Sequence, residues 1–194
     1  TANEIYCEGI EAIESRDIEY ARELGYTIKL LAIAKRNNDV VEARVHPAMV
    51  PSGSLLANIH DEYNALEVVG SAVGRQVFYG RGAGQMPTAS AVVADLVSLA
   101  ERKRAGAGSS VGDLISSQQT TARCFADINS TEIRYYMGMI VDDRPGVLGQ
   151  TALILAQHQI SIASVMQQER DLEGGAVPLI IVTHEAREAA MAQA

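Results

Sequence analysis

Three glycines stand close together in the segment Gly80-Arg-Gly-Ala-Gly84, shortly before the helical pattern of residues 87–104. A glycine-rich turn between a strand and a helix N-terminus brings backbone N–H groups and the positive end of the helix dipole toward an anion or a flat cofactor. The turn lacks the full G-x-G-x-x-G spacing of a dinucleotide fingerprint, and the strands before it read as antiparallel. The pattern alone leaves two interpretations open, a cofactor contact and a tight turn without a ligand.

A second segment that could bind a ligand is Asp142-Asp-Arg-Pro-Gly-Val-Leu148, which ends a predicted strand and opens a predicted helix. Either aspartate could cap the helix, and Pro145 stands near its first turn. The free backbone amides of such a helix start could hold a carboxylate, for example that of an amino acid. Gln167 and Gln168 close the neighbouring predicted strand and could add side-chain amides. A well-capped helix without a ligand is the alternative.

The other residue types that do chemistry show no arrangement typical of an active site. The four histidines have no ligand spacing, so we expect no metal site. No serine lies in a G-x-S-x-G elbow, and neither cysteine has a local motif that marks a nucleophile. Lys29 lies in an apolar run, where a buried amine could acquire a low pKa, although its ammonium more commonly reaches the strand edge. We therefore assign no catalytic residue.

The hydrophobic pattern predicts the elements that position these segments. Residues 15–25 form a short amphipathic helix, with Ser15 as its cap, Ile18, Ala21 and Leu24 on one face, and a terminating glycine. Apolar and β-branched runs predict about four strands in one mostly antiparallel sheet, at residues 27–35, 40–46, 67–71 and 76–79, the last two joined by a turn around Gly74. Proline near the first turn and three basic residues in the last turn predict a helix over residues 87–104.

Residues 105–131 change composition to Gly, Ala, Ser, Gln and Thr without periodicity, which indicates a linker between a domain at 1–104 and a second domain at 132–194. The second domain reads as β-α-β-β-α, one strand short of the ferredoxin-like β-α-β-β-α-β arrangement. We therefore expect it to be incomplete at its C-terminus. Its predicted elements are strand 133–141, helix 146–158, strand 160–168, turn 171–175, strand 176–182 and a helix start at 183–194.

Composition excludes several functional classes. The chain has 194 residues, 47% of them hydrophobic, and a net charge of −8, so a packed core is expected and neither nucleic acid nor an anionic membrane is an expected partner. Two distant cysteines without C-x-x-C spacing fit a reducing compartment, and the cytoplasm is the expected location. The longest apolar runs fall far below the ~20 residues that a membrane helix needs, and no signal segment opens the chain.

An ordered series of five segments in the first half resembles homoserine dehydrogenase. The segments are residues 8–10 (EGI), 24–35 (LGYTIKLLAIAK), 44–51 (RVHPAMVP), 64–70 (NALEVVG), and 78–84 (FYGRGAG) with 87–95 (PTASAVVAD). Residues 134–194 resemble the ACT domain that follows in many bacterial members of this family. The resemblance implies an α+β fold, in which the C-terminal part of a mostly antiparallel catalytic and dimerisation region precedes a truncated ferredoxin-like ACT domain.

Enzymes of this family interconvert L-homoserine and L-aspartate 4-semialdehyde with NAD or NADP, in the biosynthesis of threonine, methionine and isoleucine. By resemblance, Gly84, with Gly82 and Ala83 beside it, approaches the nicotinamide end of the cofactor, where a side chain would collide with the ring. The family's nucleotide-binding domain and catalytic lysine would lie upstream of Thr1, so the 194 residues alone are expected to lack turnover.

ACT domains pair side by side and bind amino acids near the turn after their first strand. Asp143, Gly146, Val147 and Leu148 resemble that motif, and threonine is the effector that the resemblance implies. A homodimer or tetramer is expected. The alternative from another class is a stand-alone amino-acid-binding regulatory module that partners another subunit, although the detailed match over residues 5–104 counts against it.

Overall fold

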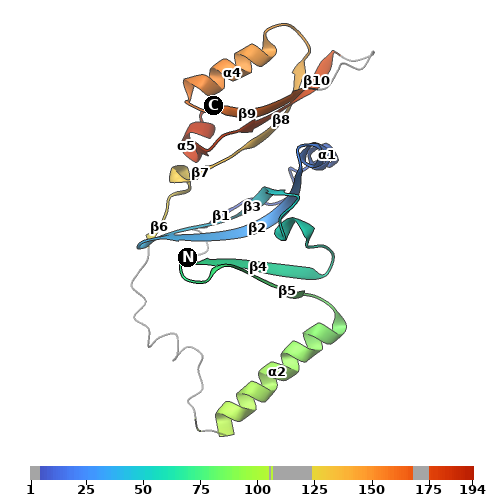
Figure 1. Cartoon of the computed structure of the whole chain (residues 1–194), viewed down its shortest axis with the longest axis vertical. Coiled ribbons are helices and arrows are strands. Elements are labelled where there is room, and N and C mark those ends of the chain that lie inside the picture. The colour runs from blue at the N-terminus through green and yellow to red at the C-terminus, as the bar shows by residue number, and fades with distance from the viewer. Residues whose placement is uncertain (1–4, 105, 107–123, 168–174) are drawn as a thin grey trace. The chain divides into compact units, whose positions relative to one another are not determined.

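The computed structural model describes residues 5–104, 106, 124–167 and 175–194 (Figure 1). These residues form two compact units. The composite unit contains the described residues up to Met49 and those from Cys124 onward, and the inserted unit contains the described residues from Val50 to Gly106. Most of the predicted linker, residues 105 and 107–123, lies outside the described residues, as does most of the predicted turn at 171–175.

The first sheet of the composite unit is built around one long strand. The first two predicted strands are confirmed as β2 (Tyr26–Asn37) and β3 (Val40–Pro51), which pair with each other, and both are longer than the pattern predicts. Two short strands, β1 (Tyr6–Cys7) and β6 (Cys124–Phe125), pair in parallel with β3. Strand β6 lies in the stretch that composition assigns to the linker.

The prediction that four strands form one sheet is wrong for the described residues. Strands β4 (Tyr63–Gly70) and β5 (Gly74–Arg81) form a separate two-stranded sheet. The reason lies in β3, because β2 pairs with one of its edges while β1 and β6 pair with the other. A strand has only two hydrogen-bonding edges. Where β3 pairs with β1 and β6, both of its edges are occupied, so β4 cannot pair with it there.

Helix α1 (Ser15–Glu23) confirms the first predicted helix, but its cap and buried face differ from the prediction. Glu14, not Ser15, is the N-cap residue, and its backbone N–H donates to Asp17 Oδ2 at 2.9 Å. Tyr20 and Ala21 are buried, whereas Ile18 is 46% exposed. The buried stripe is shifted because Tyr136 donates a hydrogen bond to Asp17 Oδ1 at 2.8 Å, on the same side of the helix as Tyr20.

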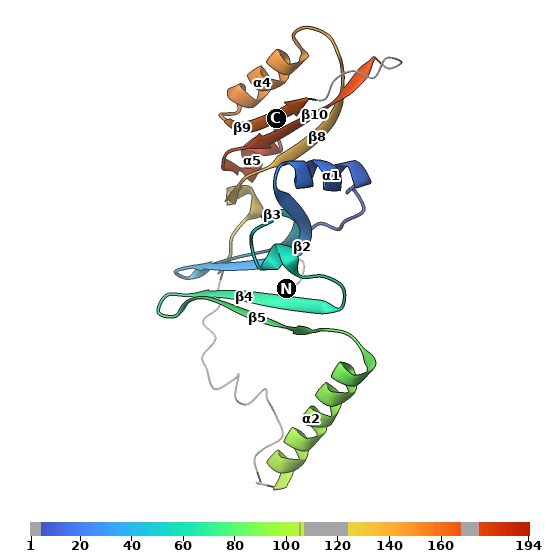
Figure 2. The same cartoon turned by 45° about the vertical axis from the view of Figure 1, so that its right-hand side comes forward.

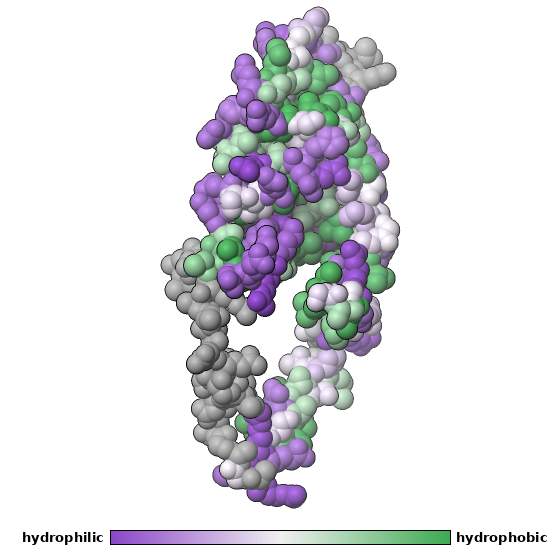
Figure 3. Space-filling view, turned by 60° about the vertical axis from the view of Figure 1, so that its left-hand side comes forward, coloured by the Kyte–Doolittle hydropathy of each residue, from purple (hydrophilic) through white to green (hydrophobic). Residues whose placement is uncertain are grey.

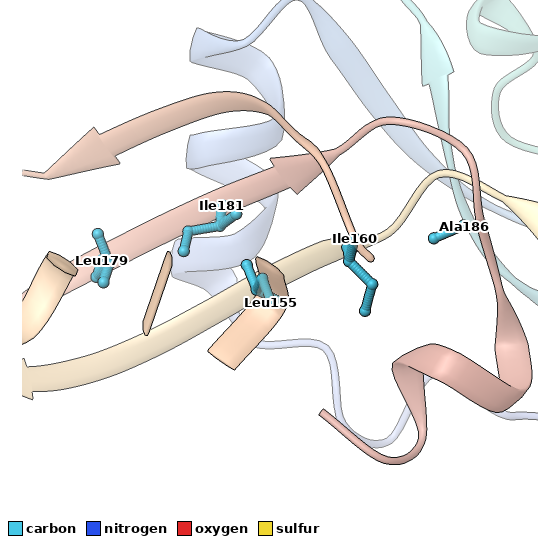
Figure 4. Close-up of a cluster of buried hydrophobic side chains, with 5 residues drawn as sticks. All are labelled: Leu155, Ile160, Leu179, Ile181 and Ala186. Carbon is cyan, nitrogen blue, oxygen red and sulfur yellow. The ribbon is translucent and has the colours of Figure 1, made fainter. Parts of the chain in front are cut away.

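The second sheet has the predicted strand-helix-strand-strand order. It contains β8 (Tyr136–Asp142), α4 (Val147–Gln157), β9 (Ile162–Gln167) and β10 (Ala176–Thr183), and β10 pairs antiparallel with both other strands. The central position of β10 explains its continuous apolar run, because both of its faces are buried. Figure 4 shows the core cluster, which consists of Leu155, Ile160, Leu179, Ile181 and Ala186.

The predicted helix from Thr183 onward is wrong over its first residues. Thr183 still belongs to β10, and β11 (Ala186–Arg187) pairs with β7 (Glu132–Ile133), so helix α5 spans only Glu188–Met191. Two hydrogen bonds explain the difference, because Thr183 N–H donates to the Tyr135 carbonyl and Tyr135 N–H donates to Thr183 Oγ1, each at 2.9 Å. These long-range bonds hold Thr183 in an extended conformation.

The inserted unit consists of a 3-10 turn at Leu56–Asn58, the β4–β5 hairpin and helix α2 (Gln85–Arg104), which Figure 2 shows from a second side. The predicted helix over 87–104 is confirmed, two residues longer at its start. No residue of α2 is buried among the described residues, and Figure 3 shows hydrophobic side chains exposed beside hydrophilic ones along this helix. Among the described helices, none combines the length and the apolar content needed to cross a membrane.

Candidate functional site

The segment after β8 surrounds a cavity of about 350 Å³ in the composite unit. The four residues singled out from sequence, Asp143, Gly146, Val147 and Leu148, all line it. Gln167 of β9 lines the same cavity, whereas Gln168 lies outside the described residues. Arg144 and Pro145, from the same predicted segment, also line the cavity, whereas sequence reasoning missed Val141 and Leu179.

The start of helix α4 differs from the predicted capped helix. Gly146 is its N-cap, with φ +97°, and no side chain makes a capping hydrogen bond. Pro145 therefore precedes the cap instead of standing in the first turn. The left-handed conformation explains the glycine, because an L-residue rarely adopts this φ.

Two backbone N–H groups at this helix start are left without an acceptor in the described part of the chain. The first helical bond joins Gln150 N–H to the Gly146 carbonyl at 2.8 Å. The N–H groups of Leu148 and Gly149 have no acceptor among the described residues. Two N–H groups without an acceptor, together with the positive end of the α4 dipole, favour the binding of an anionic oxygen ligand.

The loop around the cavity is held by its own backbone. Asp143 N–H donates to the Gly175 carbonyl and Arg144 N–H donates to the Asp142 carbonyl, each at 2.9 Å. The Arg144 guanidinium lies 4.0 Å from Asp142 Oδ2, and both side chains are about 70% exposed. The loop therefore offers exposed charges of both signs beside the unpaired N–H groups.

The glycine-rich turn lies in the inserted unit, directly after β5. Gly82 N–H donates to the Glu62 carbonyl at 2.8 Å, and a Cβ atom at Gly82 would collide with the side-chain amide of Asn64. Gly84 has φ +116° and accepts the first α2 bond, from Thr88 N–H at 3.1 Å. The backbone favours glycine at Gly84, and a side chain at Gly82 would have to displace that of Asn64.

An aromatic cluster borders this turn. The rings of Tyr63 and Tyr79 stack with centroids 4.9 Å apart, and Arg81 lies over the Tyr63 ring at 5.5 Å. Arg81 Nε donates to the Tyr63 hydroxyl at 3.1 Å and lies 3.5 Å from a carboxylate oxygen of Glu62. These contacts raise the pKa of Arg81, through the Tyr63 hydrogen bond first and the Glu62 charge after it. The cluster fixes the end of β5 from which the glycine turn departs.

Other candidate groups do not assemble into a site. Within the described ranges, no group of three or more His, Cys, Asp or Glu residues could hold a metal ion. Cys7 and Cys124 are both free and exposed. Lys29 is half-buried in β2.

Comparison with known families divides the chain in the same way as the sequence motifs. Residues 1–97 match the family model described as homoserine dehydrogenase, and residues 135–194 match the ACT domain model. Among curated proteins, the chain is 42% identical over 180 residues to a homoserine dehydrogenase from Pseudomonas aeruginosa and 42% identical over 194 residues to one from Corynebacterium glutamicum. These matches cover 92% and 97% of the chain but only 42% of each relative, so the chain spans about two fifths of their length.

Solved structures give the same result. The chain is similar to a homoserine dehydrogenase from Thiobacillus denitrificans, with a TM-score of 0.85 and 38% identity over 100% of the chain and 43% of that protein. It is also similar to a homoserine dehydrogenase from S. aureus, with a TM-score of 0.62 and 26% identity over 99% of the chain and 44% of that protein.

Proposed function

Because the chain belongs to the homoserine dehydrogenase family, we propose that it serves the NAD(P)-dependent interconversion of L-homoserine and L-aspartate 4-semialdehyde, as part of threonine, methionine and isoleucine biosynthesis. Its own contribution is twofold. The glycine turn at Gly82–Gly84 approaches the nicotinamide end of the cofactor, and the ACT-like part binds an amino-acid effector, with threonine as the candidate.

The observation that carries the effector role is the cavity at the start of α4. It gathers the unpaired N–H groups beside Gly146, the exposed Arg144 guanidinium and the Gln167 amide around about 350 Å³. A carboxylate fits the N–H groups and the helix dipole, and a side-chain hydroxyl fits the amide of Gln167. This volume lies within the range of small-molecule sites and exceeds that of a single threonine.

A titration of the 194-residue chain with L-threonine, followed by calorimetry, tests the effector role. Replacing Gln167→Met removes the amide at nearly constant volume and is expected to weaken binding about tenfold, the effect of losing one or two hydrogen bonds. The matched control is Gln150→Met, on an exposed position of α4 that does not line the cavity. Absence of L-threonine binding, or equal weakening in both variants, would contradict the proposal.

The cofactor role is supported by the backbone of the glycine turn, because the φ of +116° at Gly84 disfavours a side chain there and a Cβ atom at Gly82 would collide with the Asn64 amide. The test is homoserine-dependent reduction of NADP⁺ by the natural gene product. Gly84→Ala is expected to raise KM for the cofactor up to about tenfold through about 1–2 kcal/mol of backbone strain. Gly53→Ala is the control, because a Cβ there meets open space at an ordinary φ.

We expect no turnover from the 194 residues alone, because they contain no G-x-G-x-x-G segment. Turnover at enzyme-like rates by this polypeptide would contradict the expectation that the 194 residues alone are inactive. The natural gene product without homoserine-dependent activity would contradict the reaction itself.

An oligomer of at least two copies is part of the proposal. It is supported by α2, which carries large apolar side chains that are more than half exposed among the described residues, including Val92, Leu96 and Leu99. Exposed apolar surface of this extent marks an interaction site. Light scattering at micromolar concentration tests it, and a monomeric mass would contradict it.

A further inference from the structure

A second cavity, of about 570 Å³, lies within the composite unit and has no assigned role. Its walls come from β1, β2 and β3 on one side and from the residues around β7, the end of β10 and α5 on the other. It shares no residue with the glycine turn or with the cavity at α4. Any ligand here therefore binds at a separate site.

Two arginines line this cavity. Arg44 is only 4% exposed, its Nε donates to His46 Nε2 at 2.9 Å, and its Nη1 pairs with Glu42. The imidazole Nδ1 in turn donates to the Pro47 carbonyl at 2.8 Å, so His46 is the Nδ1–H tautomer and holds the guanidinium in place. Arg134 donates from Nε to the Thr183 carbonyl at 3.1 Å, and its Nη groups have no acceptor among the described residues.

Two carboxylates line the same cavity, and each has spare capacity to accept hydrogen bonds. Glu188 accepts from the Tyr135 hydroxyl at 2.7 Å, and Glu8 accepts from the Tyr6 hydroxyl at 2.9 Å. In both carboxylates the second oxygen has no donor among the described residues. Burial and the bond to Glu188 raise the pKa of Tyr135, while the nearby Arg44 charge lowers it, so both charges act on the same phenol.

The rest of the wall is mainly aliphatic, with Ile13, Ile28, Ile33, Met49, Ile133 and Met191. We propose that this cavity binds a free α-amino acid with an aliphatic side chain. The ammonium of this ligand contacts Glu188 and Glu8, and its carboxylate contacts Arg134 and Arg44. Its side chain lies among the aliphatic residues. Arg44 is buried and Glu188 is half-buried, whereas Arg134 and Glu8 are exposed, and a zwitterion supplies a charged partner to the groups of both signs at once. The proposal is independent of the effector role of the α4 cavity.

The six methionines of the chain allow the site to be located directly. Met49 and Met191 line this cavity, and no methionine lines the cavity at α4. We would label the methyl groups of the 194-residue chain with ¹³C and titrate with L-leucine. The signals of Met49 and Met191 are expected to shift, while that of Met86, on α2, stays in place. L-leucine without these shifts would overturn the proposal.

Truncated probes and a charge variant test the recognition chemistry. 3-Methylbutylamine lacks the carboxylate and 4-methylpentanoate lacks the ammonium, so each should bind at least about tenfold more weakly than L-leucine. Glu188→Gln keeps an acceptor for Tyr135 and removes the negative charge, and it should weaken L-leucine about tenfold while leaving 4-methylpentanoate unchanged. Glu185→Gln is the matched control, because Glu185 is exposed and does not line the cavity. Equal affinity for the amine, the acid and L-leucine would overturn the zwitterion assignment.

Discussion

Removing one hydroxyl, in Tyr136→Phe, tests how the ACT-like part is joined to helix α1. The Tyr136 hydroxyl donates to Asp17 Oδ1 at 2.8 Å, across 119 residues of sequence. A hydrogen bond to a charged group contributes about 1.5–3 kcal/mol, and we take about 1–2 kcal/mol because this contact is only partly buried. At about 2–4 °C per kcal/mol for a chain of this size, the melting midpoint should fall by about 2–8 °C.

The same bond predicts how this loss depends on pH. Burial first, and then the hydrogen bond and charge of Asp17, raise the pKa of Tyr136 above its ordinary value of about 10. The folded state therefore keeps the phenolic proton at a pH where the unfolded state has lost it. The stabilising effect is complete below about pH 10 and declines above it, by up to about 1.4 kcal/mol per pH unit, whereas the Tyr136→Phe variant has no such decline.

Urea denaturation at several pH values from about 7 to about 11.5 measures both effects. The control is Tyr26→Phe, because the Tyr26 hydroxyl has no hydrogen-bond partner among the described residues. We expect Tyr136→Phe to destabilise the protein at neutral pH and the difference from wild type to shrink above about pH 10. A difference that stays constant over the whole pH range, or equal effects of the two substitutions at neutral pH, would refute the reasoning.

Four further substitutions test the core and the helix start. Leu179→Ala should lower the free energy of unfolding by about 2–5 kcal/mol, because Leu179 is 0% exposed in the core cluster. Leu153 is 64% exposed, so Leu153→Ala should lower it by less than about 0.5 kcal/mol. Chemical denaturation measures both effects. Gly146→Ala should cost about 1–2 kcal/mol through its φ of +97° and weaken L-threonine binding in calorimetry. Gly149→Ala should leave stability unchanged or raise it, because a Cβ there meets open space within a helix, and a loss like that of Gly146→Ala would contradict the backbone argument.

Elements whose ends depend on their own residues could be predicted from sequence. Helix α2 ends at the basic run Arg102–Arg104, as predicted. The turn between β4 and β5 covers residues 71–73 and leads into Gly74, around which it was predicted, and the φ of +69° at Gly74 favours a glycine there. In both cases the deciding physics lies within a few residues, so the local pattern contains it.

Long-range pairing could not be predicted in the same way. Strands β1 and β6 are two residues each, too short for any periodicity, and their partner β3 lies far along the chain. The extended conformation of Thr183 depends on Tyr135, 48 residues earlier. Similarly, the cap of α4 is a glycine instead of an aspartate, because the backbone at Gly146 is left-handed, which the residue types alone do not reveal.

The candidate sites show the same limit. The sequence pattern groups Asp143, Gly146, Val147 and Leu148 in one segment, and they line one cavity, but the contribution of Leu179 comes from a strand that follows later. Their roles in ligand binding stay predictions. The burial of Arg44 could not be predicted from sequence, because the pattern of an alternating strand does not show whether an arginine side chain is exposed or buried.

The composite unit also has a consequence for the order in which the protein folds during synthesis. Its β3 is made before the inserted unit, yet the strands and residues that complete the composite unit, from β6 to Glu188, are made only after the whole inserted unit. The β4–β5 hairpin joins neighbouring residues and can form while translation continues, whereas the cavity around Arg44 closes only after residues 188–192 have been made. Early termination before Glu188 should therefore leave the inserted unit intact and the long β2–β3 hairpin exposed to aggregation.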